Sequence, residues 1–289
     1  MKKPLIAVEP LPAFLVDDAV RNALAEDLGR AGDITTAATV PASTHAHAVL
    51  AARNPGRIAG LDFCVSAFKT LDPSIEININ VPDGADVAQG ETIAVIKGPA
   101  RPILSAERVA LNFTGRLSGV ATATSNLVAL VAGTRARVTC TRKTTPGMRA
   151  AEKYAVRCGG GFNHRFALDD GVLIKDNHIV AAGGITAAIH AARRSTGHMV
   201  RIEVEVDRLD QLDEALAAGA NAILLDNMSP ALLREAVGRT NGRAILEASG
   251  NIDATTIAAV AATGVDLISS GAITHSAKCL DIGLDFQPA

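Results

Sequence analysis

The sequence predicts an α/β protein made mainly of parallel strand–helix units, most simply closed into a βα barrel. From residue 136 onward, short aliphatic runs alternate with helical runs every 20 to 30 residues, which is typical of parallel βα units. At least six such units follow one another, and no GxGxxG motif follows the first strand, so a barrel is favoured over a dinucleotide-binding sheet. The residues before about position 100 have a different character, which indicates a smaller N-terminal region.

The N-terminal region reads as a helix followed by several short strands. Residues Val16 to Asp27 form an amphipathic helical pattern. The stretches "HAHAVLAARNPGRIAG" (45–60), "SIEININ" (74–80) and "PDGADVAQGETIAVIKG" (82–98) alternate or turn in the manner of half-buried strands. The segment "GPARP", Gly98 to Pro102, breaks this pattern and is predicted to be a linker.

A long helical segment, or a pair of helices, is predicted from Ser105 to residue 133. Ser105 is a plausible N-cap, and Glu107 suits the positive end of the helix dipole. Arg108 does not, because a cation in the first turn is disfavoured by about 0.3–1 kcal/mol. Helix physics alone therefore favours a solvated role for Arg108.

The barrel strands and helices follow in order. The predicted strands are "ARVTCT" (136–141), "GVLIK" (171–175), "RIEVEV" (201–206), "AILLD" (222–226), "AILEAS" (244–249) and "VDLISS" (265–270). The later helices are "GITAAIHAARRST" (184–196), "RLDQLDEALAAG" (208–219), "PALLREAVGRT" (230–240) and "DATTIAAVAATG" (253–264).

Composition limits the functional classes. With 289 residues and a net charge of −2, the chain can bury a sizeable core and has no overall charge that would attract nucleic acid or a membrane surface. The four cysteines are far apart, so reduced core thiols are favoured over disulfides or zinc. No signal peptide is predicted at the start and no run of 18 apolar residues occurs, so a cytoplasmic location is expected.

Polar residues gather where barrel strands end, which is where barrel enzymes carry their active sites. Alternation along "RIEVEV" turns Glu203 and Glu205 toward the interior, opposite the branched residues. In the same way, Glu247 and Ser249 share a face of "AILEAS". The residues at or near the strand ends are Lys175, Glu205, Asp226, Glu247, Ser249, Ser270 and Gly271.

Positive charge concentrates in one stretch, "TRKTTPGMRAAEKYAVRCGGGFNHR" (141–165). On the helical part, Arg149, Lys153 and Arg157 follow i, i+4, i+8 spacing and read as a solvated face. Arg142, Lys143 and Arg165 flank that helix at loops, and are candidates for anion binding. They are joined by His164 and by three glycines at 159–161 that permit close approach of the backbone to a ligand.

Two loops, "EASGN" (247–251) and "SSGA" (269–272), follow the last two strands and lead toward helices. Small residues in these places form the usual phosphate cradle of such barrels. Together with the basic loops, they predict an enzyme that acts on a strongly anionic substrate containing phosphate. The residues alone leave the reaction open.

The motifs "RKTTPGMR", "GGGFNHR", "LIKDNHI", "EVEV", "LLDNM" and "EASGNI", in this order, resemble the quinolinate phosphoribosyltransferase family. The resemblance covers nearly the whole chain, including "EDLGRAGDITT" (26–36) and "ERVALNFTGRLSGVAT" (107–122). It implies the conversion of quinolinate and phosphoribosyl pyrophosphate, with magnesium, to nicotinate mononucleotide, pyrophosphate and carbon dioxide. It also implies an N-terminal open sandwich (1–115, joined by 275–289), an incomplete seven-stranded α/β barrel (116–274), and a homodimer or a hexamer with shared sites.

The resemblance also implies a role for each matching residue. Quinolinate-binding positions fall on Arg142, Lys143, His164, Arg165 and Lys175, with Arg108 supplied by the neighbouring subunit. Lys143, Lys175, Glu205 and Asp226 are the implied catalytic residues, and the two carboxylates are the implied partners of the ribose hydroxyls and magnesium. Binding of phosphoribosyl pyrophosphate is implied for Glu205, Asp226, Ser249, Gly250, Asn251, Ser270 and Gly271. The phosphate cradle falls on Ser249 to Asn251 and Ser270 to Gly271, although many relatives have a second glycine in place of Asn251.

Three other interpretations compete with this one. Lys175 at a strand end also suits a Schiff-base lyase or aldolase, although the surrounding arginines argue against it. A relative acting on a different pyridine or pyrimidine base would not need the set of Arg142, Lys143, His164 and Arg165. A non-catalytic ligand-binding barrel would not need Glu205, Asp226 and Lys175 together.

Overall fold

The computed structural model describes residues 8–287, which divide into two compact units. The first unit contains the residues up to Ser125, residues 146–160 and the segment from Ala277 on. The second contains residues 126–145 and 161–276. The prediction that the chain starts without a signal peptide depends partly on residues 1–7, which lie outside the described residues.

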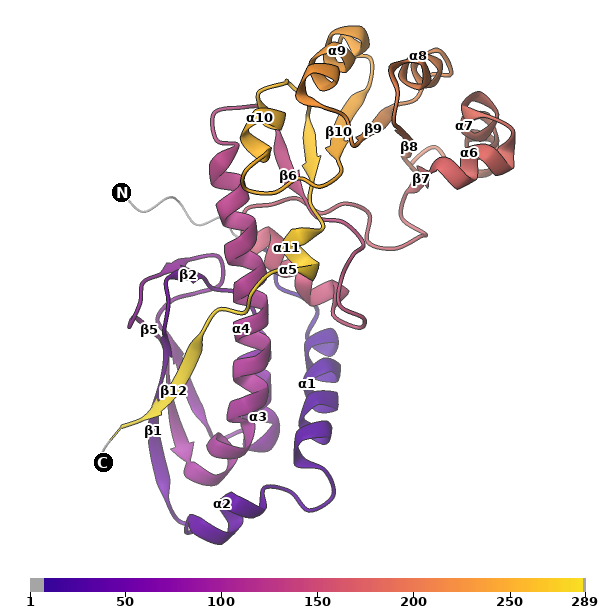
Figure 1. Ribbon diagram of the computed structural model, residues 1–289. Coiled ribbons are helices and arrows are strands. Elements are labelled where there is room, and N and C mark those ends of the chain that lie inside the picture. The colour runs from indigo at the N-terminus through magenta and orange to yellow at the C-terminus, as the bar shows by residue number, and fades with distance from the viewer. Residues whose placement is uncertain (1–7, 288–289) are drawn as a thin grey trace. The chain divides into compact units, whose positions relative to one another are not determined.

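The first unit is built on an antiparallel sheet in the order β12-β1-β5-β3 (Figure 1). The strands are β1 (His45–Ala52), β3 (Glu76–Ile79), β5 (Thr92–Pro99) and β12 (Ile282–Phe286), and a ribbon pairs β2 (Gly56–Arg57) with β4 (Asp86–Val87). The helices are α1 (Ala13–Leu28), α2 (Ile34–Thr39), α3 (Leu61–Leu71) and α4 (Ala100–Leu130). Leu50, Ile93 and Ile96 on the strands and Phe68 on α3 are fully buried in an aliphatic core.

Two predictions about the start of the long helix are wrong. The segment Gly98 to Pro102 is no linker, since β5 ends at Pro99 and α4 begins at Ala100. Proline at the third position of a helix is tolerated because its missing N–H would have no partner in the first turn. Ser105 therefore lies inside α4, where its hydroxyl donates to Asp33 Oδ2 at 3.0 Å, and the dipole argument about Arg108 does not apply.

Helix α5 (Arg149–Cys158) belongs to the first unit, and its predicted solvated basic face is only partly confirmed, since Arg157 is exposed, Arg149 is half-buried and Lys153 is buried. Lys153 is only 2% exposed, and the neighbouring Glu152 is completely buried. Glu152 accepts hydrogen bonds from Arg116 on α4, at 2.6 Å from Nη2 and 3.1 Å from Nε. The spacing of the basic residues on α5 could not reveal this burial, because helical periodicity does not say which face of a helix packs on a neighbour.

The second unit contains a parallel sheet, and all six predicted strands are confirmed in it. Its order is β6-β11-β10-β9-β8-β7, with every neighbouring pair parallel. The strands are β6 (Arg137–Thr139), β7 (Val172–Ile174), β8 (Ile202–Val206), β9 (Ala222–Asp226), β10 (Ile245–Ser249) and β11 (Leu267–Ser269). A seventh strand was implied, and instead of one the described residues show an isolated parallel bridge between Thr139 and Phe162.

Helices follow the strands of the second unit, as predicted. They are α6 (Asp176–Ala182), α7 (Ile185–Ser195), α8 (Leu209–Ala217), α9 (Pro230–Thr240), α10 (Ile257–Ala261) and α11 (Ala272–His275). Branched side chains of the strands, such as Val204, Ile223 and Ile268, are fully buried. Every strand therefore runs into a loop at the same edge of the sheet, and the polar residues noted in the sequence lie at that edge.

No helix within residues 8–287 is both long and apolar enough to cross a membrane. All four cysteines are free thiols. Cys64, Cys140 and Cys158 are buried as predicted, whereas Cys279 is exposed.

Candidate active site

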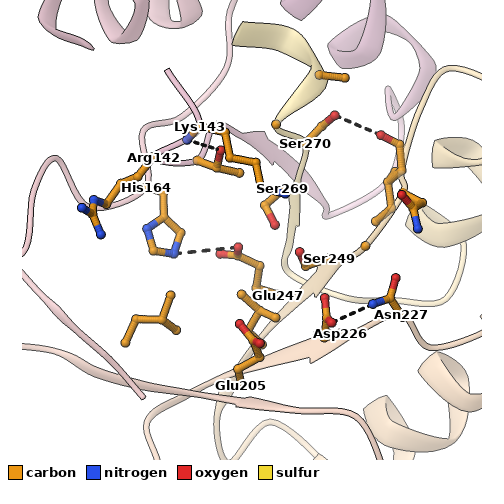
Figure 2. A pocket seen from close by; sticks show the side chains of 18 of the residues that line it. Arg142, Lys143, His164, Glu205, Asp226, Asn227, Glu247, Ser249, Ser269 and Ser270 are labelled. Atoms are coloured by element: carbon orange, nitrogen blue, oxygen red, sulfur yellow. Dashed lines mark hydrogen bonds and ion pairs between the residues drawn. The ribbon is translucent and has the colours of Figure 1, made fainter. Parts of the chain in front are cut away.

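A cavity of about 810 Å³ lies in the second unit, at the carboxyl ends of its strands (Figure 2). The sequence-predicted residues that line it are Arg142, Lys143, His164, Arg165, Lys175, Glu205, Asp226, Ser249, Gly250, Asn251, Ser270 and Gly271. Residues from the ends of six strands and from the loop that contains His164 and Arg165 thus share one cavity. Arg108 is not in this lining and is an exposed residue of α4 in the first unit.

Arg142 and Arg165 form the most strongly positive part of the cavity. The Nε–H group of each is buried and has no hydrogen-bond acceptor among the described residues. Arg165 donates from Nη1 to the Gly171 carbonyl at 2.8 Å, which fixes the direction of its side chain. Burial, followed by the nearby charge of Arg142, lowers the pKa of Arg165, so the two guanidinium groups repel each other until an anion is bound.

Two carboxylates face the cavity from β8 and β9. Glu205 Oε2 accepts from Lys175 Nζ at 2.7 Å, which joins the ends of β7 and β8. Asp226, the last residue of β9, accepts from Asn227 Nδ2 at 2.7 Å and keeps its other carboxylate oxygen for a ligand (Figure 2). Carboxylate oxygens in this position suit ribose hydroxyls and also suit magnesium, which prefers oxygen ligands.

The loop after β6 places Lys143 beside the loop after β11. The Lys143 amide donates to Thr141 Oγ1 at 3.0 Å, and its carbonyl accepts from Thr274 Oγ1 at 2.7 Å. A β-carbon on Gly271 would lie 2.9 Å from Lys143 Cδ, so a larger residue there would make the lysine side chain shift. The Lys143 side chain is exposed in the cavity mouth, where it can meet an anion.

The loop after β10 requires unusual backbone angles. Gly250 has φ +100°, and a β-carbon there would collide with the side chain of Asn227. Asn251 has φ 49° and Asn227 has φ 53°, in the left-handed region where asparagine is tolerated. The Ser270 hydroxyl donates to the Ile252 carbonyl at 2.9 Å, so its proton links the two loops rather than pointing at a ligand.

Both ring nitrogens of His164 have protein partners. Nδ1 accepts the Arg165 backbone N–H at 2.8 Å, and Nε2 lies 3.1 Å from Glu203 Oε2. The Arg165 amide therefore occupies Nδ1, and Glu203 occupies Nε2. In this arrangement it holds the Arg165 backbone and offers no ring nitrogen to a substrate.

Glu247 lines the cavity; the sequence placed it at a strand end but predicted no role for it. It is 2% exposed, and its Oε1 lies 3.9 Å from His164 Nε2 (Figure 2). Burial, and then the negative charge of Glu203, raise the pKa of Glu247 to about 7. The alternation along "AILEAS" already pointed this side chain inward, so the signal was present in the sequence.

Other lining residues were not predicted. They include Thr141, Leu173, Asn227, Ile252, Asp253, Ser269 and His275. Most of them are next to a predicted residue in the chain. His275 belongs to α11 and not to a strand end, so the pattern of polar strand ends could not predict it.

Comparisons with known proteins match the whole described architecture. A family model for "Quinolinate phosphoribosyl transferase, C-terminal domain" matches residues 120–285, and one for the N-terminal domain of the same family matches residues 33–118. The chain is 45% identical to the probable carboxylating nicotinate-nucleotide pyrophosphorylase of Bacillus subtilis, over 90% of this chain and 89% of that one. It is also 45% identical to the carboxylating enzyme of that name from Mycobacterium leprae, over 93% of this chain and 96% of that one.

A solved structure of a relative has the same fold. The nicotinate-nucleotide pyrophosphorylase of Francisella tularensis superimposes with a TM-score of 0.93 at 43% identity, covering 98% of this chain and 100% of that chain.

Proposed function

The chain belongs to the quinolinate phosphoribosyltransferase family, and we propose that its substrates bind and react in the cavity of the second unit. The enzyme transfers the phosphoribosyl group from phosphoribosyl pyrophosphate to quinolinate with decarboxylation. The products are nicotinate mononucleotide, pyrophosphate and carbon dioxide, in the synthesis of NAD.

The pair of arginines is the observation that carries the assignment of the site. Quinolinate has two carboxylates, and planar guanidinium groups match a carboxylate better than ammonium groups do. Arg142 and Arg165 each hold a buried Nε–H without an acceptor, so an arriving carboxylate completes their hydrogen bonding and relieves their mutual repulsion. His164 takes part by fixing the Arg165 backbone.

Phosphoribosyl pyrophosphate occupies the rest of the cavity in this proposal. Lys143 and Lys175 offset the charge of the pyrophosphate, and the loops 249–251 and 270–271 receive the 5′-phosphate through backbone N–H groups. The ring nitrogen attacks ribose carbon 1 as pyrophosphate leaves, and positive charge develops on the sugar. Glu205 or Asp226 stabilises that charge from its strand end.

Magnesium bound together with phosphoribosyl pyrophosphate would offset the negative charge of its phosphate oxygens. The donor set fits, since Glu205 and Asp226 present carboxylate oxygens to the same cavity. Both carboxylates also orient the ribose through its hydroxyl groups.

We also propose that the segment around Phe162 takes the place of the seventh strand in an incomplete seven-stranded barrel. The Phe162 amide donates to the Val138 carbonyl at 2.8 Å, and its carbonyl accepts from the Cys140 amide at 3.1 Å. These are the two bonds that a parallel neighbour of β6 would make.

The active assembly is proposed to be a homodimer, or a larger assembly of dimers, in which Arg108 of one subunit reaches the cavity of the other. Its position supports this, because Arg108 is exposed and is not part of the lining of its own chain's cavity in the described residues. An exposed arginine on a rigid helix suits binding of a partner's anionic ligand.

The direct test is to incubate the enzyme with quinolinate, phosphoribosyl pyrophosphate and magnesium while carbon dioxide and the mononucleotide are measured. Arg165→Ala is expected to raise the quinolinate KM by about 100-fold, because a charged hydrogen-bonding partner worth about 3 kcal/mol is removed. Arg239→Ala, which removes an exposed ion-paired arginine on α9, is the matched control and should change KM little. Unchanged saturation by quinolinate in Arg165→Ala would refute the assignment.

A further inference from the structure

Glu247 is a buried carboxyl group that faces the cavity and is not used in the mechanism above. It is 2% exposed, and its Oε1 has no hydrogen-bond partner among the described residues. An ionised carboxylate buried in this way, without a partner for one oxygen, costs several kcal/mol. Glu247 therefore needs either a positive partner or a proton.

His164 is the nearest basic group, but it is not hydrogen-bonded to Glu247. Its Nδ1 accepts the Arg165 amide proton at 2.8 Å. Its Nε2 lies 3.1 Å from Glu203 Oε2, and Glu247 Oε1 is farther away at 3.9 Å. The attraction of His164 lowers the pKa of Glu247, but burial and the charge of Glu203 raise it by more.

Glu203 makes ionisation of Glu247 still less favourable. Ligand atoms of His164, Glu203 and Glu247 all lie within 4.8 Å of one another. Two carboxylates at this separation repel each other, so ionising both of them costs free energy. Glu247 is the more buried of the two, with a side chain 3% exposed against 13% for Glu203, so it is the one that keeps the proton.

The reaction requires a proton in this part of the cavity. When the 2-carboxylate of the ring leaves as carbon dioxide, the electron pair of the broken C–C bond remains on ring carbon 2, next to the quaternary nitrogen. A proton must then bond to that carbon to give nicotinate mononucleotide. Its source must lie near Arg142 and Arg165, where the carboxylates of quinolinate are held.

We infer that Glu247 is the general acid that delivers this proton to ring carbon 2. The inference rests on the proposed function. The Oε1–H bond breaks, the proton joins the electron pair on carbon 2, and Glu247 is left as a carboxylate that regains a proton from water after product release. No oxidant or reductant is involved, and charge balances because the carboxylate of the substrate leaves as neutral carbon dioxide.

The lysines of the cavity are less suited to this role. Lys175 is held at 2.7 Å by Glu205, and its side chain is 48% exposed, so its charged form is stabilised. Lys143 is exposed beside Gly271, on the loops assigned to phosphate. Glu247, by contrast, is buried next to His164, whose backbone neighbour is Arg165.

The test is single-turnover kinetics of Glu247→Gln, with pyrophosphate and nicotinate mononucleotide measured separately by rapid quench. Glutamine keeps the size of the side chain but has no proton to transfer. Pyrophosphate release is expected to stay within about threefold of the wild-type rate, while mononucleotide formation slows by about 100-fold or more. In the wild type, mononucleotide formation should fall as pH rises above about 7, because Glu247 then loses its proton.

Glu203→Gln is the matched control, since it removes the other carboxyl of the cluster, which does not line the cavity in the described residues. It should still form the mononucleotide, and the fall in rate at alkaline pH should start at a lower pH than in the wild type. The negative charge of Glu203 raises the pKa of Glu247, and this variant lacks it. The groups facing Glu247 are Glu203 on β8, His164 before β7 and Ser269 on β11, so only Glu203 adds a negative charge.

Each outcome decides the inference. Mononucleotide formation by Glu247→Gln at the wild-type rate overturns it, as does equal slowing of both steps, which would mean that Glu247 only positions His164. A stoichiometric metal ion bound by the cluster in the purified wild type also overturns it, because the ligand would be the ionised carboxylate. If Glu247→Gln fails to fold, the pH profiles test the inference instead. A wild-type rate that does not fall above about pH 7, or a fall at the same pH in Glu203→Gln, overturns it. A wild type that forms no mononucleotide defeats the proposed function itself.

Discussion

Single residues show how far alternation along a strand can be trusted. It correctly turned Glu203, Glu205 and Glu247 to the same side as His164 and the cavity, where Glu205 and Glu247 line the cavity and Glu203 pairs with His164. It could not reveal that both ring nitrogens of His164 are occupied, because that depends on the direction of the Arg165 amide in a loop. Residue roles that depend on loop geometry are therefore beyond a sequence pattern.

The protonated state of Glu247 has a consequence for stability that does not depend on catalysis. A carboxyl whose pKa is raised from 4.5 to about 7 in the folded protein holds a proton there after the unfolded chain has lost it. The free energy of unfolding of the wild type should therefore fall by about 3 kcal/mol relative to Glu247→Gln as pH rises from about 5 to about 8. Urea unfolding of both proteins across this range measures the difference, and parallel curves would contradict the proton on Glu247.

At the scale of elements, strand and helix types were predictable and their boundaries were not. The six parallel strands stand out because each is a short aliphatic run followed by a polar end. The start of α4 was missed since Pro102 resembled a break, although proline is tolerated in a first turn. The burial of Lys153 and Glu152 on α5 was missed because it depends on packing against α4, through Arg116.

Helix α4 has small residues where the C-terminal segment crosses it, and this contact is testable. A β-carbon on Gly119 would collide with the backbone carbonyl of Lys278, which cannot move as a flexible side chain could. Gly119→Ala should lower the free energy of unfolding by about 1–3 kcal/mol. Gly238→Ala on α9, where nothing lies within 4 Å, is the control and should raise it by about 0.5–1 kcal/mol through helix propensity. Chemical denaturation compares them, and equal effects would argue against the crossing.

On the scale of the whole molecule, the sequence predicted the class of fold and most of the cavity lining. The predicted division at residues 115 and 116 falls inside α4, and residues 146–160 belong to the first unit. The continuous helical pattern of α4 contains no signal for a boundary, since a helix can pass from one unit to the next without a break. Contacts that are distant in sequence decide such divisions, and a single sequence does not contain them.

The proposed shared site makes a prediction about mixed assemblies. Arg108→Ala and Lys175→Ala subunits are each expected to be nearly inactive alone, because each lacks a side chain that every site needs. Mixed dimers contain one cavity with Lys175 intact that receives Arg108 from the other subunit, so random mixing should restore about a quarter of wild-type activity. Activity measured after co-refolding checks this, and no recovery in verified mixed dimers would place Arg108 outside the site.

The pairing of β12 with β1 has a consequence for how the protein is made. During translation, β1 leaves the ribosome early, but its neighbour on one side emerges only after the complete second unit. Until then the nascent chain carries an open strand edge, which is a template for pairing with other chains. The sheet of the first unit is therefore completed only after the second unit has been synthesised, and chaperones that shield exposed strands are most needed in that interval.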